Sequence, residues 1–279
     1  MTCLAEAANN PEFNDYSLIL DDIEYGSLMD VERYFGPKAA KRIRPPKEDK
    51  SCSESLEECY DNIETILEQG PCIYVVDSMD VLEAKDDQKK AEEDKKARTA
   101  GREISGSYGM AKAKLNSTRL RGIVNKLRKT GSILIIISQT RDNIGFGFET
   151  KTRAGGRALR FYAHLEIWSS ANKKIKKKIR DKDREVGALI DLQIRKNRYS
   201  GWLGKVQVPF LRGYGIDDIG SCLDYLQEEK AIPKITNRSL EIDKIESSAK
   251  EGIALRKKVK ETWEAVEKGI LPDRKPRYT

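Results

Sequence analysis

A run of five apolar residues, ILIII at positions 133–137, constrains the fold of this chain more than any other part of its sequence. The run is too short to cross a membrane, and its β-branched side chains favour a strand that is covered on both faces, as in a parallel sheet. Ser138 and Gln139 follow at the carboxyl end of this strand, where open α/β sheets bind their ligands. We therefore predict an α/β fold with a ligand site at this edge of the sheet.

Two further hydrophobic runs end in acidic residues, and we predict that they are parallel strands of the same sheet. Residues 73–76 are followed by Asp77 and Ser78, the pattern of a Walker B strand, whose Asp holds Mg²⁺ through water while the metal contacts nucleotide phosphates. Residues 16–20 lead to Glu24, a carboxylate of the kind that polarises an attacking water beside a γ-phosphate. Both acids also have a purely structural interpretation, as caps of a strand end or of the next helix.

The charged residues are distributed unevenly, although the formal net charge is only +7, from 52 basic and 45 acidic side chains. Basic residues gather in segments 112–128, 141–160 and 173–184, whereas acidic residues dominate segments 15–32 and 48–68. A basic surface that is separate from an acidic, metal-binding surface is what an ATP-dependent DNA-binding protein needs. Each run taken alone is also consistent with a solvated helix face.

Taken together and in this order, these segments resemble the RecA/RadA recombinase family, most of all its phage branch, over roughly residues 1–232. The most specific element is GGRALRFYA at positions 155–163, which is close to a literal family signature. The resemblance implies a RecA-like core with a mostly parallel sheet flanked by helices. It also implies nucleotide roles for four residues, namely the catalytic Glu24, the Walker B residues Asp77 and Ser78, and the nucleotide-sensing Gln139.

The same resemblance implies two DNA-binding loops and one contact between subunits. Residues 105–114 resemble the end of the first loop and the start of its helix, and residues 144–157 resemble the second loop. In such loops cations neutralise phosphates, glycines let backbone amides approach them, and apolar groups separate bases. Lys196 and Arg198 resemble a family element that reaches the nucleotide of a neighbouring subunit. The implied DNA-binding residues are Lys114, Ser117, Arg121, Arg141, Ile144, Phe148, Gly155, Gly156 and Arg157.

For the complete protein, the resemblance implies ATP and Mg²⁺ as ligands and a DNA-dependent ATPase that supports recombination and repair. The implied partners are single-stranded DNA, double-stranded DNA during strand exchange, and further copies of the chain in a helical filament. A phage-encoded protein of this kind would act in the cytoplasm of its bacterial host. Five scattered cysteines and a single histidine, His164, argue for reduced thiols and against a structural metal site. Because no apolar run approaches 18 residues, we expect no membrane insertion.

One family feature is absent, because no G-x-x-x-x-G-K-[ST] phosphate loop occurs in the 279 residues. The amides of such a loop, with the helix behind it, supply most of the field that binds nucleotide phosphates. Residues 1–8, MTCLAEAA, resemble the interior of that helix, so we expect the chain to begin shortly after the loop, through a split gene, an intron or a misplaced start codon. We accordingly expect poor ATP affinity for this chain alone, and hydrolysis once the loop is supplied.

The domain organisation follows from composition and pattern. We expect a RecA-like core at 1–232, a charged helical insertion at 83–104, a small helical region at 233–269 with Trp263 as its anchor, and a disordered tail at 270–279. Residues 173–183 lie between predicted strands 163–168 and 186–195, so they are expected to form an exposed hairpin tip. Phe161 and Tyr162 are expected in the core of the first of these strands.

Two functions of other classes stay open beside the recombinase interpretation. A non-catalytic accessory protein that binds single-stranded DNA would have little reason to retain Glu24, Asp77, Gln139, Lys196 and Arg198 together. A hexameric helicase motor with the same core would not be expected to carry GGRALRFYA and two DNA-binding loops. Rings rather than helical filaments in electron micrographs would indicate the helicase.

Overall fold

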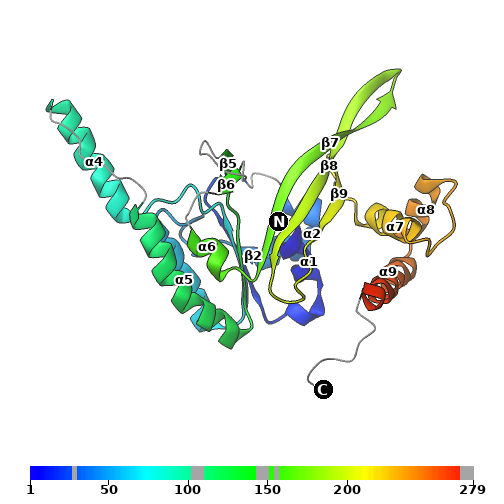
Figure 1. The fold of residues 1–279 in the computed structure, drawn as a ribbon, viewed down its shortest axis with the longest axis horizontal. Helices are drawn as coiled ribbons and strands as arrows, with labels where there is room; N and C mark the ends of the chain where they lie inside the picture. The colour runs from blue at the N-terminus through cyan, green and yellow to red at the C-terminus, as the bar shows by residue number, and fades with distance from the viewer. Residues whose placement is uncertain (27–29, 102–109, 143–150, 154–156, 271–279) are drawn as a thin grey trace. The chain divides into compact units, whose positions relative to one another are not determined.

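The computed structural model describes residues 1–26, 30–101, 110–142, 151–153 and 157–270, and the chain divides into two compact units, Met1–Ala163 and His164–Thr279 (Figure 1). The first unit contains a parallel sheet between helices. The second contains an antiparallel sheet followed by helices. The predicted α/β class is therefore confirmed.

The parallel sheet of the first unit has four strands in the order β2-β1-β3-β4. These are β1 (Ser17–Asp22), β2 (Ile43–Arg44), β3 (Cys72–Asp77) and β4 (Ile133–Ile136). The register places Asp22 of β1 opposite Asp77 of β3, so both strands end at the same level. Parallel pairing thus brings the predicted polar strand ends to one edge of the sheet, as expected.

Helices cover both faces of this sheet, because alternate strand residues point to opposite sides. On one face Leu18, Ile73 and Val75 pack with the alanines of α1 (Thr2–Asn9) and with α2 (Val31–Arg42). On the other face Tyr74 and Val76 pack with helices from later in the chain. Those helices are α3 (Leu56–Gln69), α5 (Met110–Thr130) and the short α6 (Arg157–Tyr162).

The boundaries and buried face of α3 follow from its sequence. Ser55 caps the helix by accepting a hydrogen bond from the backbone amide of Glu58 at 3.2 Å, and Gly70 follows the last turn with a φ of 145°. Apolar side chains recur at intervals of three and four residues and form one buried stripe against the sheet. This stripe consists of Leu56, Cys59, Tyr60, Ile63, Ile66 and Leu67.

Burial of β4 departs from the expectation for the 133–137 run. Ile135 packs against the α1 side of the sheet, but Ile133 and Ile137 are 43% and 40% exposed. Among the strands that the structure describes, β4 pairs only with β3, so it is an edge strand here. The ends of the run therefore lack the cover on both faces that a central parallel strand has.

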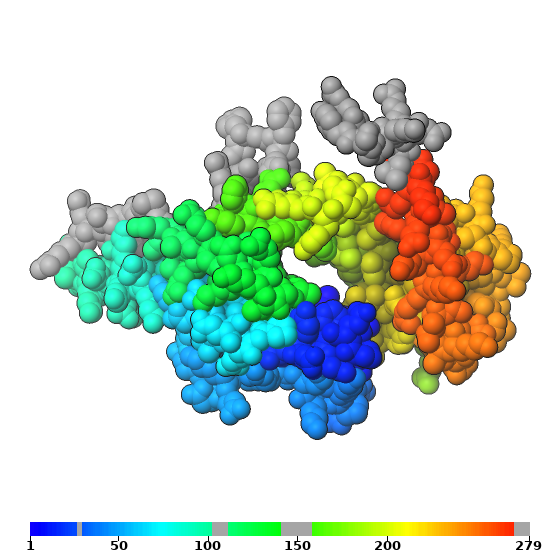
Figure 2. Space-filling view, turned by 90° about the horizontal axis from the view of Figure 1, so that it is seen from below, coloured from blue at the N-terminus to red at the C-terminus, as the bar shows by residue number. Residues whose placement is uncertain are grey.

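The antiparallel sheet of the second unit has the order β10-β9-β8-β7. Its strands are β7 (Leu165–Ile179), β8 (Lys182–Asn197), β9 (Lys205–Leu211) and β10 (Gly215–Ile216). The helices α7 (Asp218–Glu228), α8 (Arg238–Glu246) and α9 (Ala249–Ile270) follow, and Figure 2 shows α9 in red lying along α8 in orange. The expected boundary at residue 232 does not coincide with the division at residue 163, because α7 contacts β9 and the antiparallel strands group with these helices.

Trp263 packs between aromatic rings of the second unit. Its ring centroid lies 5.8 Å from that of Tyr225 on α7 and 5.9 Å from that of Trp202 in the loop before β9. The residue is nevertheless 40% exposed, so it is an anchor at the surface of the helical region. Among the helices that the structure describes, none is both long enough and apolar enough to span a membrane. The expected tail at 271–279 lies outside the described residues.

Two local expectations were wrong. Residues 173–179 and 182–183 belong to the β7–β8 ladder, and the turn is confined to Arg180 and Asp181, whose φ values of 50° and 60° match a tight hairpin turn. Phe161 and Tyr162 lie in α6 and not in the following strand. Phe161 is 66% exposed, whereas Tyr162 is partly buried and packs against the core, as expected. Phe161 and Tyr162 are the last two residues of this short helix, and the strand begins only at Leu165.

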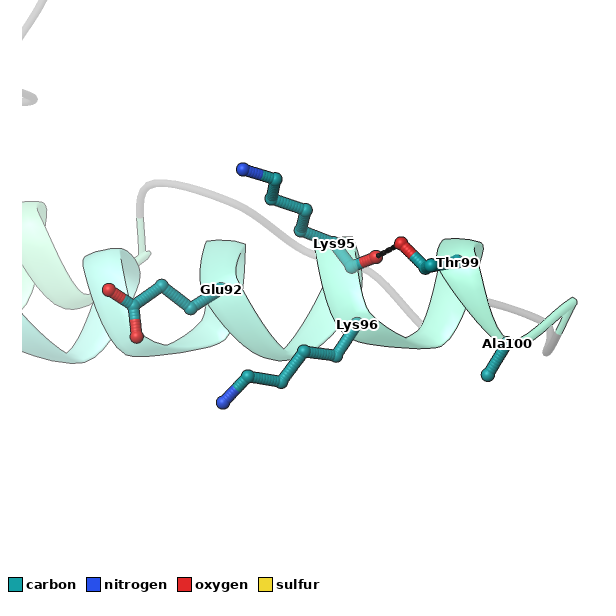
Figure 3. Close-up of a pocket in the computed structure, with 5 residues that line it drawn as sticks. All are labelled: Glu92, Lys95, Lys96, Thr99 and Ala100. Carbon is teal, nitrogen blue, oxygen red and sulfur yellow. Dashed lines mark hydrogen bonds between the residues drawn. The ribbon is translucent and has the colours of Figure 1, made fainter.

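The charged insertion contains a helix, α4 (Lys85–Thr99). Figure 3 shows its last turns, where Lys95 and Lys96 point to opposite sides and the Thr99 hydroxyl donates a hydrogen bond to the Lys95 carbonyl at 2.9 Å. Among the described residues, the depression there is lined by Glu92, Lys95, Lys96 and Thr99 of α4 and by Ala100, which follows the helix.

A buried carboxylate, Asp21, holds the loop before α3 against β1 and β3. Its Oδ1 accepts from the Ser53 amide at 2.8 Å, and its Oδ2 accepts from the hydroxyls of Ser53 at 2.6 Å and Tyr74 at 2.9 Å. Asn62 completes the network by donating to the Ser53 hydroxyl at 2.9 Å. Burial, with nearby Cys59 and Asp21, raises the pKa of Tyr74 well above its usual value, so its hydroxyl keeps its proton and remains a donor.

We expect Tyr74→Phe to lower the free energy of unfolding by about 1–3 kcal/mol, because the buried Asp21 carboxylate loses one of its donors. Urea denaturation followed by circular dichroism measures the change. Tyr34→Phe is the control, since Tyr34 is 42% exposed and its loss should alter stability by less than about 0.5 kcal/mol. Equal effects of the two substitutions would contradict the role of the Asp21 network.

Candidate functional site

The candidate site lies at the carboxyl ends of β1, β3 and β4. After β1 ends, the chain stays bound to β3, because the carbonyl oxygen of Asp77 accepts from the amides of Ile23 at 2.7 Å and Glu24 at 3.2 Å. The end of β4 is joined to the other side of β3, since the Met79 amide donates to the Ile137 carbonyl at 3.0 Å. Backbone bonds therefore hold the three strand ends together.

The Glu24 carboxylate is the centre of this site. Its Oε1 accepts a hydrogen bond from the Ser78 hydroxyl and another from the Gln139 side-chain amide at 3.0 Å. The three residues are 54 to 115 positions apart in the sequence and come from three different strand ends. Thus the structure brings together three of the residues predicted to act on a nucleotide.

Asp77, the fourth of these residues, is at the end of β3 in an acidic environment. Burial raises the pKa of Asp77 above its ordinary value, and the negative charges of Glu24 and Asp22 raise it further. The Asp22 carboxylate accepts from the Gly26 amide at 3.0 Å, which holds it near the turn that carries Glu24. Three carboxylates at one sheet edge create a negative potential that a cation would neutralise.

The residues present fit a magnesium ion only in part. Within the described ranges, no cluster of three or more His, Cys, Asp or Glu side chains has the geometry of a metal site. Mg²⁺ in nucleotide enzymes is held by one or two carboxylates together with water and phosphate oxygens, so Asp77 fits the protein side of such a site. A phosphate cradle is the part that the sequence does not contain.

Asp80 and Lys112 extend the site in a way that the sequence pattern did not indicate. The Asp80 Oδ2 accepts from the Gln139 backbone amide at 2.6 Å. The Lys112 ammonium donates to the carbonyl oxygens of Met79 at 2.8 Å, Asp80 at 3.1 Å and Leu82 at 2.6 Å. Lys112 lies in the first turn of α5, so the turn after β3 is tied both to Gln139 and to this helix. In the sequence, Lys112 is one lysine among many, and only the fold distinguishes it.

Three predicted DNA-binding residues form a stripe along α5. Lys114, Ser117 and Arg121 are spaced by three and four residues and therefore share one face of the helix. Lys114 and Arg121 are exposed, and the Arg121 Nε donates to the Tyr162 hydroxyl at 3.4 Å. The opposite side of α5 faces the core through Leu120 and Ile123. The stripe is thus a basic, solvent-facing surface.

The predicted second DNA-binding loop begins and ends on a two-stranded ladder. In this ladder β5 (Thr140–Asp142) pairs with β6 (Lys151–Arg153), and it starts directly after Gln139. The predicted DNA-binding residues Ile144, Phe148, Gly155 and Gly156 lie outside the described residues, as do the side chains of Arg141 and Arg157. Their DNA contacts stay predictions.

The Lys196-Asn197-Arg198 element lies in the second unit, at the end of β8. The Asn197 side chain fixes the turn that follows, because its amide donates to the Ser200 hydroxyl at 2.9 Å and its oxygen accepts from the Tyr199 amide at 3.0 Å. These hydrogen bonds fix the backbone conformation beside Lys196 and Arg198. Their reach to a nucleotide of another subunit stays a prediction.

Comparison with known proteins identifies relatives for most of the chain. Residues 26–217, more than half of its length, match the family model described as the RecA N-terminal domain. The chain is 28% identical over 214 residues to Protein RecA of Chlorobium limicola and 29% identical over 214 residues to Protein RecA of Chlorobaculum parvum, in each case covering 75% of this chain and 56% of the relative. It is also 29% identical over 137 residues to Protein RecA of Lactococcus lactis subsp. cremoris, covering 47% of this chain and 35% of the relative. The chain thus spans about half of the length of the first two relatives and 35% of the length of the third.

The raised pKa of Asp77 predicts a pH-dependent effect of Asp77→Asn. Because the pKa of Asp77 is higher in the folded than in the unfolded state, folding favours its protonated carboxyl. The contribution of Asp77 to stability is therefore present below the unfolded-state pKa and is lost as the pH rises through the folded-state pKa. The variant should therefore melt at a higher temperature than the unmodified protein at neutral pH, and the difference should disappear below about pH 4. Thermal unfolding across this pH range tests it. The exposed Asp15→Asn control should show no such gain, and a lower melting temperature of Asp77→Asn at neutral pH would contradict the prediction.

Proposed function

The chain belongs to the RecA family, and from this we propose that it carries the hydrolytic and DNA-contacting part of a RecA-type protein of DNA recombination and repair. The observation that carries the proposal is the convergence of Ser78 and Gln139 on the Glu24 carboxylate. In this proposal ATP and Mg²⁺ are the ligands of the β1, β3 and β4 strand ends. The protein binds single-stranded DNA and, during exchange, double-stranded DNA.

Each residue of the site has a distinct proposed role. Glu24 orients the water that attacks the γ-phosphate, and its bond from Ser78 holds the carboxylate in place. Asp77 takes the protein side of the magnesium ion, which when bound neutralises phosphate charge. Lys196 and Arg198 are proposed to approach the nucleotide of the next subunit in a helical filament, as trans-acting cations.

Gln139 is proposed to couple the nucleotide to DNA. Its side chain donates to Glu24 and its backbone amide donates to Asp80, while the next residue already belongs to the ladder that carries the second DNA-binding loop. A movement of Gln139 toward a γ-phosphate would therefore shift both bonds at the base of this loop. Such reciprocal linkage is the physical basis of DNA-stimulated hydrolysis and ATP-stimulated DNA binding.

Hydrolysis is proposed only for the chain combined with a phosphate loop. The 279 residues contain no G-x-x-x-x-G-K-[ST] sequence, and glycines alone do not replace its lysine and its helix N-terminus. The first experiment is thus DNA-stimulated ATP hydrolysis by the chain as given and by a version preceded by a strand and such a loop. Activity in the extended version alone supports the proposal, and DNA binding without activity in either version favours the accessory-protein function.

Glu24→Gln in the loop-extended version should lower the ATPase rate by about 10²–10⁴-fold, because the amide cannot accept the proton of the attacking water. Binding of single-stranded DNA, measured by fluorescence anisotropy, should be retained. Glu12→Gln is the matched control, since Glu12 is exposed and precedes β1. An unchanged rate in Glu24→Gln would refute the role of this residue.

Arg121→Ala should weaken binding of single-stranded DNA equally for different sequences. It should also reduce the slope of log affinity against log salt concentration by the amount expected for about one phosphate contact. Arg119→Ala is the control on the same helix. Arg119 pairs with Asp61 at 2.5 Å and with Glu64 at 3.6 Å on the side that faces α3, so its loss should affect stability more than DNA affinity. An equal loss of affinity in both variants would mean that only net charge matters.

A further inference from the structure

The β7–β8 hairpin extends beyond the rest of its sheet as a two-stranded ribbon, which Figure 1 shows projecting past β9. The residue pairs between β9 and β8 end at Gly187 opposite Leu211, and one further backbone bond joins Arg212 to Val186 at 2.8 Å. From there to the turn, β7 is the only strand that pairs with β8 among the described residues of the second unit. Most side chains of residues 173–185, on both faces of the ribbon, are exposed.

The pairing register divides the side chains of the ribbon between two faces. Residues that pair across strands share a face, and successive residues alternate between faces. Lys177 pairs with Arg184, and Ile179 pairs with Lys182, so these four residues share one face. We call this the cationic face, and it also includes Ile175, two residues before Lys177.

The opposite face also carries three cations, all of them lysines, but acidic residues accompany them. Lys176 pairs with Glu185 and Lys178 pairs with Asp183 across the strands. Lys174 forms an ion pair with Glu185 at 2.7 Å, and this contact lowers the pKa of Glu185. We call this the paired face. Its charges are largely compensated within the ribbon.

The cationic face has no such compensation. Between Ile175 and Gly187, the acidic residues of the described ribbon lie on the paired face or, in the case of Asp181, in the turn, where it contacts Lys178 at 3.6 Å. Lys177 and Arg184 lie directly opposite each other, an arrangement that destabilises a sheet. Ile179, two residues beyond Lys177 on the same face, is 40% exposed. A like-charged pair that costs stability, on a stretch where β7 and β8 have only each other as strand partners among the described residues, points to a ligand with negative charge.

We propose that the cationic face of the β7–β8 ribbon binds the phosphate backbone of double-stranded DNA, as a contact surface separate from α5 and the β5–β6 loop. Duplex DNA offers one negative charge per about 1.7 Å, and its major groove admits a two-stranded β-ribbon. The strand from residue 173 to 179 is about 20 Å long, at about 3.3 Å per residue, so it lies along several phosphates. Three cations on one face, beside the exposed Ile179 and the half-buried Ile175, suit contact without base recognition. The inference rests on the proposed DNA function of this chain.

The test compares two triple variants that remove the same charge from opposite faces. Lys177→Thr, Lys182→Thr and Arg184→Thr together remove the cationic face, and Lys174→Thr, Lys176→Thr and Lys178→Thr together are the control. Threonine is chosen because it favours strands. Affinity for a labelled duplex is measured by fluorescence anisotropy between about 50 and 200 mM salt, where phosphate contacts dominate.

Loss of three phosphate contacts should reduce the magnitude of the slope of log affinity against log salt concentration by about 2.7. It should also weaken duplex binding by roughly tenfold or more. The control triple should change the slope much less, although its net charge is the same. Equal effects of the two triples, or none, would overturn the proposal. An equally large effect of the first triple on single-stranded DNA would overturn its assignment to duplex.

A second measurement uses the unaltered protein and does not depend on the folding of a variant. Lysine acetylation followed by mass spectrometry should show that duplex DNA protects Lys177 and Lys182 more than Lys176 and Lys178. Equal reactivity on both faces would overturn the proposal. If the unaltered chain bound no DNA of either form, the proposed function would fail first, whereas intact single-stranded DNA binding with an unprotected ribbon would contradict this inference alone.

Discussion

The carbonyl oxygen of Asp77 accepts hydrogen bonds from the backbone amides of Ile23 and Glu24, and the arrangement of the candidate site depends on these two bonds. Without them the chain would leave the sheet after β1, and Glu24 would have no defined position relative to Ser78 and Gln139. The bonds exist because β1 and β3 run parallel and in a register that ends both strands at the same level. Strand register thus determines which carboxylate receives the two side-chain donors.

Two polar networks with different environments lie along this edge. The Asp21 carboxylate is fully buried and satisfied by hydroxyl and amide donors, so it orders the loop before α3 and strengthens the core. Asp77 and Glu24 are closer to solvent, and burial together with the charges of Glu24 and Asp22 raises the pKa of Asp77. Natural proteins commonly accept such a cost at functional sites, where a ligand later compensates it. The contrast separates the structural Asp21 from the two acids to which we assign a nucleotide role in the proposed function.

The basic residues are divided in a similar way. On α5, Arg119 and Lys126 form ion pairs with acids of α3, including Glu64, whereas Lys114 and Arg121 face solvent on a different side of the helix. On the β7–β8 ribbon, one face is paired and the other is not. Surface ion pairs add little to stability, but they remove a cation from the set that is available to phosphates. The positions of the uncompensated cations are therefore more informative about DNA contacts than the net charge of +7.

The sequence by itself determined the α/β class, the strand that ends at Asp77, the strand that precedes Ser138 and Gln139, and the family resemblance. Hydrophobic runs and the polar residues after them are local patterns that can be recognised without coordinates. It also indicated Glu24, Ser78 and Gln139, but not that they form one hydrogen-bonded group, since bonds across 54 to 115 positions depend on strand order and register. Asp80 and Lys112 had no distinguishing pattern, because the Lys112 ammonium is defined by three carbonyl oxygens and not by neighbouring letters. Likewise, the dense run of lysines in residues 173–184 resembled a solvated tip. Only cross-strand pairing decided that Lys174, Lys176 and Lys178 share a face with acids whereas Lys177, Lys182 and Arg184 do not, because side-chain direction in a ribbon is set by register.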